Sequence, residues 1–328
     1  MISLWDTSGS QVVKALAAER RSAGGVASGM ALSLIVVVDE SQVHEAEAAA
    51  TIAAAAHPCR LLMVIRSDID RPTSRLDAEI VVGGRLGPCE AVVMRMYGRL
   101  ALHAESVVMP LLVPDVPVVT WWHREAPEQL ATDFLGVVAD RRITDAAQAG
   151  DPIAALRHRA LDYAPGDTDL IWTRITPWRT LVAGALDARP ARITGARILA
   201  PLADPTGALM SGWLASRLGV RPRLEPAADA PRMRTVALTC DNGDELVLTR
   251  DGDRGVFSRT GEPDQHLPLT RRPLGEELAE ELRRLDADQV YADALSALSG
   301  ETGLDGRAGH RVHVWRDPVV PYPVGAHA

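Results

Sequence analysis

Two uninterrupted apolar runs constrain the fold of this chain more than any other feature. Residues 31–38 (ALSLIVVV) and 60–65 (RLLMVI) show no alternation of apolar and polar residues. Such runs are typical of strands that are buried on both faces. Between them, residues 41–56 are alanine-rich and favour a helix, which ends at His57 and Pro58. This order of strand, helix and strand predicts a largely parallel sheet with helices on both faces.

The same alternation continues through the first half of the chain. Further apolar runs predict strands at residues 78–82, 91–96, 116–120 and 134–139 and helices at residues 10–20 and 100–112. Asp151 and Pro152 form an N-cap and a first helical position, and that helix runs to about Asp162. The segment 164–167 (APGD) then marks a boundary. We therefore expect an N-terminal α/β layered domain over residues 1–163.

The second half has a different pattern and predicts a C-terminal α+β domain over residues 164–328, with an extended tail. Strands are expected at residues 192–199, 235–240, 245–249, 255–258 and 312–315, and helices after Pro177, at 207–218, along 274–285 and after Asp288. Asn242-Gly243 and Asp251-Gly252 suit tight hairpin turns, which need positive φ angles. These short strands predict an antiparallel meander.

Composition excludes several chemistries. The chain of 328 residues carries a formal net charge of −8, which argues against binding to nucleic acid. Lys14 is its only lysine, so the GxxxxGK[ST] phosphate loop is absent, and no GxGxxG, GxSxG or HExxH motif occurs. We therefore expect no catalytic residues, no cofactor and no metal.

The three cysteines lie far apart in the sequence. Cys59, Cys89 and Cys240 form no CxxC motif, and we interpret them as small buried apolar residues with no local pair. The first dozen residues lack the basic and apolar regions of a signal peptide, and no apolar stretch is long enough to span a membrane. These features predict a cytoplasmic protein that does not bind membranes.

Four of the seven tryptophans fall in two short segments. Trp121 and Trp122 follow the predicted strand 116–120, at the sheet edge where ligands and partners dock in parallel sheets. His123 and Arg124 come next and would lie at the same edge. Since adjacent strand residues point to opposite faces, at least one tryptophan packs inward. The alternatives are that both belong to the core, or that the segment forms a partner-binding surface.

The second segment, residues 172–179 (WTRITPWR), contains Trp178 between two arginines. Arg174 and Arg179 flank Thr176-Pro177, where they would bind an anion at a helix N-terminus or pair with carboxylates across a domain seam. The glutamates at 276, 277, 280 and 281 are interpreted as a solvated helix face, in which Glu280 pairs with Arg284.

Three separated elements carry a resemblance to a known family. His57-Pro58-Cys59-Arg60, residues 110–122 (PLLVPDVPVVTWW) and residues 169–179 (DLIWTRITPWR) occur in this order. In content and spacing they resemble the glucose-6-phosphate dehydrogenase assembly protein family, OpcA. The arginine-rich, lysine-poor composition is similar to that of an actinobacterial member. The resemblance implies a protein that is not an enzyme, binds glucose-6-phosphate dehydrogenase and promotes its active oligomer, at the entry to the oxidative pentose phosphate pathway.

The first hypothesis is therefore a non-catalytic assembly factor and allosteric activator of glucose-6-phosphate dehydrogenase. Its candidate interface comprises Trp121, Trp122, His123, Arg124, Arg174, Trp178 and Arg179. The alternative is a sugar-phosphate-binding enzyme or sensor, such as a lactonase-like hydrolase, with Arg66, His123, Arg174 and Arg179 lining its site. A third hypothesis is a chaperone of assembly that leaves the kinetics of the mature dehydrogenase unchanged.

Overall fold

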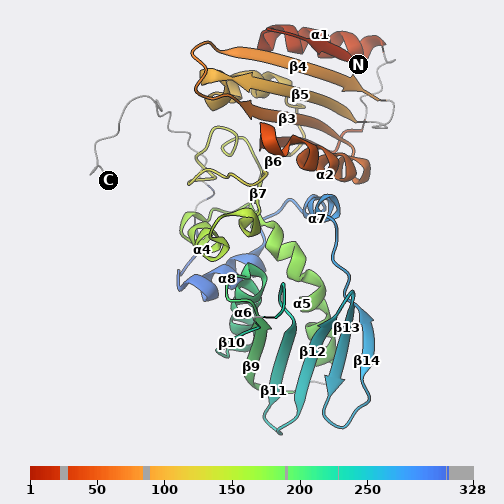
Figure 1. The fold of residues 1–328 in the computed structure, drawn as a ribbon, viewed down its shortest axis with the longest axis vertical. Helices are drawn as coiled ribbons and strands as arrows, with labels where there is room; N and C mark the ends of the chain where they lie inside the picture. The colour runs from red at the N-terminus through yellow and green to blue at the C-terminus, as the bar shows by residue number, and fades with distance from the viewer. Residues whose placement is uncertain (23–28, 84–88, 189–190, 228, 308, 310–328) are drawn as a thin grey trace, which may run out of the picture.

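Two β-sheets, each with helices packed against it, organise the chain (Figure 1). The computed structural model describes residues 1–22, 29–83, 89–188, 191–227, 229–307 and 309. The strand predicted at 312–315 lies outside the described residues. The mixed α/β architecture, with one mostly parallel and one mostly antiparallel sheet, confirms the predicted fold class.

The first sheet has eight strands in the order β1-β4-β5-β3-β2-β6-β7-β8. Their bounds are β1 Ile2–Leu4, β2 Leu32–Asp39, β3 Cys59–Ser67, β4 Arg75–Val82, β5 Glu90–Tyr97, β6 Val118–Trp122, β7 Arg141–Thr144 and β8 Asp167–Asp169. The six strands from β5 to β8 in this order are parallel, whereas β1 and β4 run antiparallel to their neighbours. The two apolar runs form β2 and β3 at its centre.

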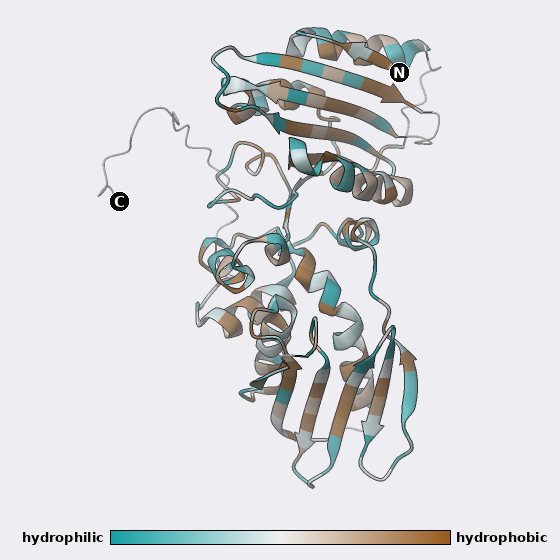
Figure 2. Cartoon of the chain, in the orientation of Figure 1, coloured by the Kyte–Doolittle hydropathy of each residue, from teal (hydrophilic) through white to brown (hydrophobic). Residues whose placement is uncertain are grey.

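Helices cover both faces of this sheet, as the apolar runs predict. The helices of the first half are α1 Gly9–Ser22, α2 Val43–Ala56, α3 Glu105–Val108 and α4 Pro152–Asp162. Along β2, Leu34 and Val36 share a core with α2, whereas Ile35 and Val37 share another with α1. Figure 2 shows the hydrophobic residues along β3 and along strands of the second sheet. Burial on both faces therefore explains why β2 lacks an alternating pattern.

The second sheet has six strands in the order β10-β9-β11-β12-β13-β14. Its strands and helices are α5 Leu170–Ala188, β9 Ile193–Ala200, α6 Pro205–Leu218, β10 Arg223–Pro226, β11 Thr235–Cys240, β12 Glu245–Asp251, β13 Arg254–Arg259, β14 Gln265–Pro268, α7 Leu274–Glu281 and α8 Gln289–Ser299. Gly243 and Gly252 have φ angles of 87° and 58° in the two hairpin turns. Strands β11 to β13 form the predicted antiparallel meander, and β14, which was not predicted, extends it.

Two expected elements of the first half are corrected. The helix expected at 100–112 is broken into the short α3 and two 3-10 turns, Gly98–Leu102 and Met109–Leu111. The strand expected at 134–139 is absent, and the strand of this region is β7. Residues 134–139 instead fold over β6, where Thr120 Oγ1 donates to the Leu135 carbonyl at 2.8 Å.

Helix α5 begins earlier than its proline suggests. It starts at Leu170, and Pro177 lies inside it. The Asp169 carboxylate accepts the Ile171 N–H at 3.0 Å and satisfies the first turn. Pro177 removes only the hydrogen bond that its N–H would donate to Thr173. Thr176-Pro177 is therefore not a helix start, and Arg174 and Arg179 lie in the body of the helix.

The chain passes between the two halves more than once near residue 163, because Leu156 and Ala160 of α4 pack in the core of the second half. Residue 163 follows the end of α4, and β8 then joins the edge of the first sheet before α5 begins. Helix α7 returns from the second half and packs beside α2, as Figure 1 shows between the two sheets. The two halves therefore share a seam built from β7, β8, α5 and α7.

The crossing of α6 and α8 yields the first testable prediction. A Cβ on Gly212 would lie 2.2 Å from the carbonyl oxygen of Ala294, so Gly212→Ala must push the two helices apart. We expect a loss of roughly 1–3 kcal/mol in the free energy of unfolding, measured by chemical denaturation. The matched control is Gly184→Ala in α5, where a Cβ meets nothing within 4 Å. This control should raise stability by about 0.5–1 kcal/mol, because alanine favours helix. Equal effects of the two changes would contradict the close crossing.

Candidate functional site

The two tryptophans at the carboxyl end of β6 are core residues. Trp121 is 0% and Trp122 2% exposed. They point to opposite faces: Trp121 packs in the core that includes α2, and Trp122 in the core that includes α1. This agrees with the alternative in which both tryptophans belong to the core. Their role is to fill space beneath the sheet edge.

His123 and Arg124 continue from β6 and meet Glu45 at the start of α2. His123 is buried, its Nε2 lies 3.2 Å from Glu45 Oε2, and its ring meets Trp121 edge-on. Burial lowers the pKa of His123, although Glu45 opposes that effect. Arg124 Nη2 lies 3.4 Å from the same carboxylate, and its side chain is 38% exposed. Of residues 121–124, Arg124 is therefore the one that reaches the surface.

A cavity of about 290 Å³ opens at this edge of the first sheet. Its apolar lining includes Val37, Val64 and Trp122. The charged residues of the lining are Glu105, Glu125, Asp133 and Arg66, and Arg66 pairs with Asp39 outside the lining.

Arg174 closes the seam between the two halves. Its Nη1 and Nη2 lie 2.6 and 2.7 Å from the two carboxylate oxygens of Asp145, a bidentate pair. Its Nε also donates to Glu277 Oε2 at 2.8 Å. Both carboxylates are buried. Arg174 therefore joins the loop after β7 to α7, and the alternative of a carboxylate pair across the seam is confirmed.

The glutamates of α7 correct the expectation of a solvated face. Glu277 and Glu281 are 2% and 5% exposed, and Glu281 Oε2 accepts from Arg141 Nη2 at 2.7 Å. Their spacing of four residues places them on one side of the helix. That side faces buried arginines rather than water. Glu280 instead pairs with Arg283, and not with Arg284 as expected.

Trp178 and Arg179 also lie inside the second domain. Trp178 is 1% exposed. The Arg179 guanidinium lies 3.4 Å from the centre of the Trp172 ring, and Nη2 donates to Thr176 Oγ1 at 2.7 Å. Burial lowers the pKa of Arg179 to about 10. This arginine is thus held by an aromatic face rather than by the carboxylate that was expected.

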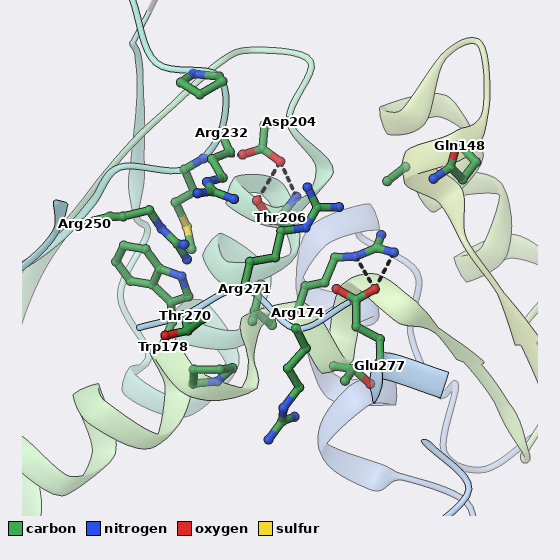
Figure 3. Close-up of a pocket in the computed structure, with 17 residues that line it drawn as sticks. Gln148, Arg174, Trp178, Asp204, Thr206, Arg232, Arg250, Thr270, Arg271 and Glu277 are labelled. Carbon is green, nitrogen blue, oxygen red and sulfur yellow. Dashed lines mark hydrogen bonds and ion pairs between the residues drawn. The ribbon is translucent and has the colours of Figure 1, made fainter. Parts of the chain in front are cut away.

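A second cavity lies at the seam, where α5, α7, β12 and the start of α6 meet (Figure 3). It measures about 250 Å³ and is rich in arginine. Its five arginines are Arg174, Arg232, Arg250, Arg271 and Arg272. Arg174 and Trp178 were candidates from the sequence, whereas Arg232, Arg250 and Arg271 were missed. These three are spread over forty residues without a motif, so only the fold brings them together.

The residues named for the enzyme alternative do not share a site. Arg66 lines the cavity of the first sheet, and His123 is buried at the same edge. Arg174 lines the cavity at the seam, whereas Arg179 stacks on Trp172. Among the described residues, no group of three His, Cys, Asp or Glu side chains is arranged to hold a metal ion. Within the same residues, no helix is both long and apolar enough to cross a bilayer.

Two of the cysteines meet, which corrects the expectation of no local pair. Cys59 donates its N–H to Cys89 Sγ at 3.4 Å, and Cys89 Sγ donates to the Ala54 carbonyl. The hydrogen bond between the thiols and burial raise the pKa of Cys59. Strands β3 and β5 are neighbours, with Arg60 opposite Glu90, so residues thirty positions apart become adjacent. All three cysteines are buried, as expected.

Fold and site together define a mixed α/β protein with two sheets, whose halves are joined by arginine–carboxylate pairs beside an arginine-lined cavity. Two family models match this chain: the glucose-6-phosphate dehydrogenase subunit N-terminal domain over residues 50–161 and its C-terminal domain over residues 165–295. The chain belongs to this family, OpcA.

Two curated relatives carry the name OxPP cycle protein OpcA. The protein of Synechococcus elongatus is 31% identical over 278 residues, which cover 76% of this chain and 57% of the relative. The protein of Synechocystis sp. is 28% identical over 185 residues, which cover 52% of this chain and 39% of the relative. The chain thus matches about half the length of these relatives.

Solved structures give only distant likenesses. The 3-ketoreductase KijD10 of Actinomadura kijaniata is 12% identical with a TM-score of 0.43, covering 87% of this chain and 100% of its own. An inositol dehydrogenase homolog of Azotobacter vinelandii is 10% identical with a TM-score of 0.38, covering 85% and 88%. At these values the likeness carries no argument about chemistry.

The seam predicts a large effect of removing one charge. Arg174→Ala leaves the buried Asp145 and Glu277 without their shared cation, and we expect a loss of about 3–5 kcal/mol in the free energy of unfolding. The control is Arg283→Ala, which removes an exposed pair with Glu280 and should change stability by less than about 0.5 kcal/mol. Urea denaturation of both variants measures the difference. Similar losses in the two would show that the seam pair is not the stronger one.

Asp169 predicts a pH dependence of stability. Burial and the nearby charge of Asp145 raise the pKa of Asp169 to about 6, from a model-peptide value of 3.8. The folded state therefore holds this proton longer than the unfolded state, and stability falls as the pH rises between the two values. Asp169→Asn removes this slope. From about pH 4.5 to about pH 7.5, the wild type should lose about 2 kcal/mol relative to the variant in denaturation experiments. Parallel curves of unfolding free energy against pH for the wild type and Asp169→Asn would contradict this prediction.

Proposed function

We propose that this protein binds glucose-6-phosphate dehydrogenase, promotes its assembled form and raises its activity, without chemistry of its own. The observation that carries the proposal is the match of both halves of the chain to domains described as a glucose-6-phosphate dehydrogenase subunit. The relatives' name, OxPP cycle protein, supports a role in the oxidative pentose phosphate pathway. The proposed compartment is the cytoplasm.

Activation by binding requires a preference between two forms of the dehydrogenase. A protein that binds both forms equally shifts nothing, however tightly it binds. The proposed activator therefore contacts the active form more favourably, by an amount that is typically about 1–3 kcal/mol in allosteric systems. The expected signature is a higher rate at sub-saturating substrate when the two proteins form a complex.

We place the docking surface at the loop that follows β6, around Arg124. Arg124 has a φ angle of 74°, which costs energy in a residue other than glycine and is retained where the surroundings hold it. Its side chain reaches the surface, and arginine is enriched among the residues that dominate binding energy. Trp121 and Trp122 would hold this loop from beneath. Trp178 is buried, and Arg174 and Arg179 are partly buried with their partners inside the chain, so these three would act only through the fold.

The docking proposal predicts a selective loss of affinity. Arg124→Ala should weaken the complex with the cognate dehydrogenase by about 2 kcal/mol, roughly thirtyfold in Kd, with an unchanged melting temperature. The matched control is Arg217→Ala, since both arginines form one ion pair of 3.4 Å and their side chains are 38% and 41% exposed. Light scattering after size exclusion, with activity measured across the fractions, records complex and rate together.

The outcomes separate the hypotheses. Co-elution with a raised rate supports activation, whereas co-elution with unchanged kinetics supports a chaperone of assembly alone. No complex over a broad concentration range would overturn the proposal. Lactone hydrolysis by the isolated chain would favour the enzyme alternative. Equal losses of affinity in Arg124→Ala and Arg217→Ala would move the docking surface elsewhere.

A further inference from the structure

Three arginines of the cavity at the seam lack the ion-pair partners that Arg174 and Arg272 have; Arg232 and Arg250 are half-buried, and Arg271 is exposed. Arg174 pairs with Asp145 and Glu277, and Arg272 lies 3.9 Å from Glu280. Among the described residues, none of Arg232, Arg250 and Arg271 forms an ion pair. They come from the loop before β11, from β12 and from the loop after β14, and Figure 3 shows them gathered around one space.

Arg250 shows most clearly that placing these three arginines together is electrostatically unfavourable. Burial and the positive charges of Arg232 and Arg271 together lower its pKa to about 10, although Asp253 and Asp204 oppose this effect. Its Nη1 donates to the Leu269 carbonyl at 3.2 Å, but its Nε is buried without a hydrogen-bond partner. Its guanidinium lies 5.3 Å from the centre of the Trp178 ring. A fixed, partly buried cation with an unused donor needs an anion beside it.

The two carboxylates in the lining do not supply that anion. Glu277 is engaged by Arg174. Asp204 caps α6, where it accepts from the N–H and the hydroxyl of Thr206 and from the N–H of Met233. Besides the pair of Arg174 and Glu277, the lining thus holds three arginines without ion pairs to the described residues and one carboxylate, that of Asp204. This excess of positive charge suits a dianionic group.

The remaining lining is polar and suits hydroxyl groups. The hydroxyl groups of Thr206 and Thr270 and the amide of Gln148 also line the cavity, and Figure 3 shows Gln148 on the side away from Arg232 and Arg250. The volume of about 250 Å³ exceeds that of a single phosphate group. It lies near the lower end of the range for small-molecule sites, on the order of 300 Å³. The arrangement therefore offers forked cations for an anion and neutral groups for a hydroxylated body.

We propose that this cavity binds a phosphomonoester of a hydroxylated compound, of the sugar-phosphate class, with its phosphate held by Arg232, Arg250 and Arg271. Guanidinium groups bind phosphate oxygens in pairs, so the site needs neither a lysine nor a glycine-rich loop. The proposal does not depend on binding to the dehydrogenase, because every residue of the site belongs to this chain. Without ligand, the three cations repel one another.

Calorimetry on the isolated chain tests the site, at constant ionic strength and without dehydrogenase. The probes are glucose 6-phosphate, inorganic phosphate and glucose. We expect glucose 6-phosphate to bind more tightly than inorganic phosphate and glucose to give no signal. The variant is Arg232→Ala combined with Arg271→Ala, which should weaken glucose 6-phosphate binding at least tenfold. Arg234→Ala is the matched control, since this exposed arginine lies two positions from Arg232 and pairs with Asp229 outside the lining.

A second readout separates binding from folding. In phosphate-free buffer the double variant should melt no lower than the wild type, because it removes repulsion, and it should lose the rise in melting temperature that glucose 6-phosphate gives the wild type. Binding that persists unchanged in the double variant, or no binding of either phosphate compound, would overturn the proposal. Equal affinities for inorganic phosphate and glucose 6-phosphate would overturn the claim that the site recognises the hydroxylated part of its ligand.

Discussion

The need to pair buried charges determines how the two halves of this protein meet. Arg141 with Glu281, and Arg174 with Asp145 and Glu277, connect the last strands of the first sheet to α5 and α7. A buried charge left alone is so costly that each of these elements has only one acceptable position. Helix α7 is thereby held against α2, close enough that Gly275 leaves no room for a Cβ beside Ile52. The seam is therefore specified by charge as much as by apolar contact.

The same rule distinguishes the candidate residues by role. Arg174 is satisfied by two carboxylates, and Arg179 by an aromatic face and a hydroxyl, so both maintain the fold. Arg250 keeps a buried Nε without a partner beside a cavity. Arg141 and Arg179 also keep a buried Nε without a partner among the described residues, but neither lines the cavity. What distinguishes Arg250 is therefore an unused donor beside a cavity, which points to a ligand there.

The sequence predicts most elements but few of the contacts between them. Continuous apolar runs identify β2 and β3, and Asp-Pro and Asn-Gly pairs identify the start of α4 and a hairpin, because these signals act over a few residues. The glutamates of α7 were assigned to solvent since a polar face normally meets water, and nothing local reveals that arginines one hundred residues earlier lie opposite. Cys59 and Cys89 were judged separate for the same reason. Strand order is a long-range property, and it decides which distant residues become neighbours.

The tryptophan segments show why a family motif is not itself an interface. Trp121, Trp122 and Trp178 fill the interior, each at most 2% exposed. Large aromatic side chains bury the most area per residue, so they fix the positions of the elements that carry them. Two arginines lie beside them: Arg124 follows Trp122 and His123 at the sheet edge and pairs with Glu45, and the Arg250 guanidinium lies 5.3 Å from the centre of the Trp178 ring. The tryptophan segments therefore contribute indirectly. Their packing makes the core rigid, and a rigid core lets the charged side chains at the surface keep a fixed geometry.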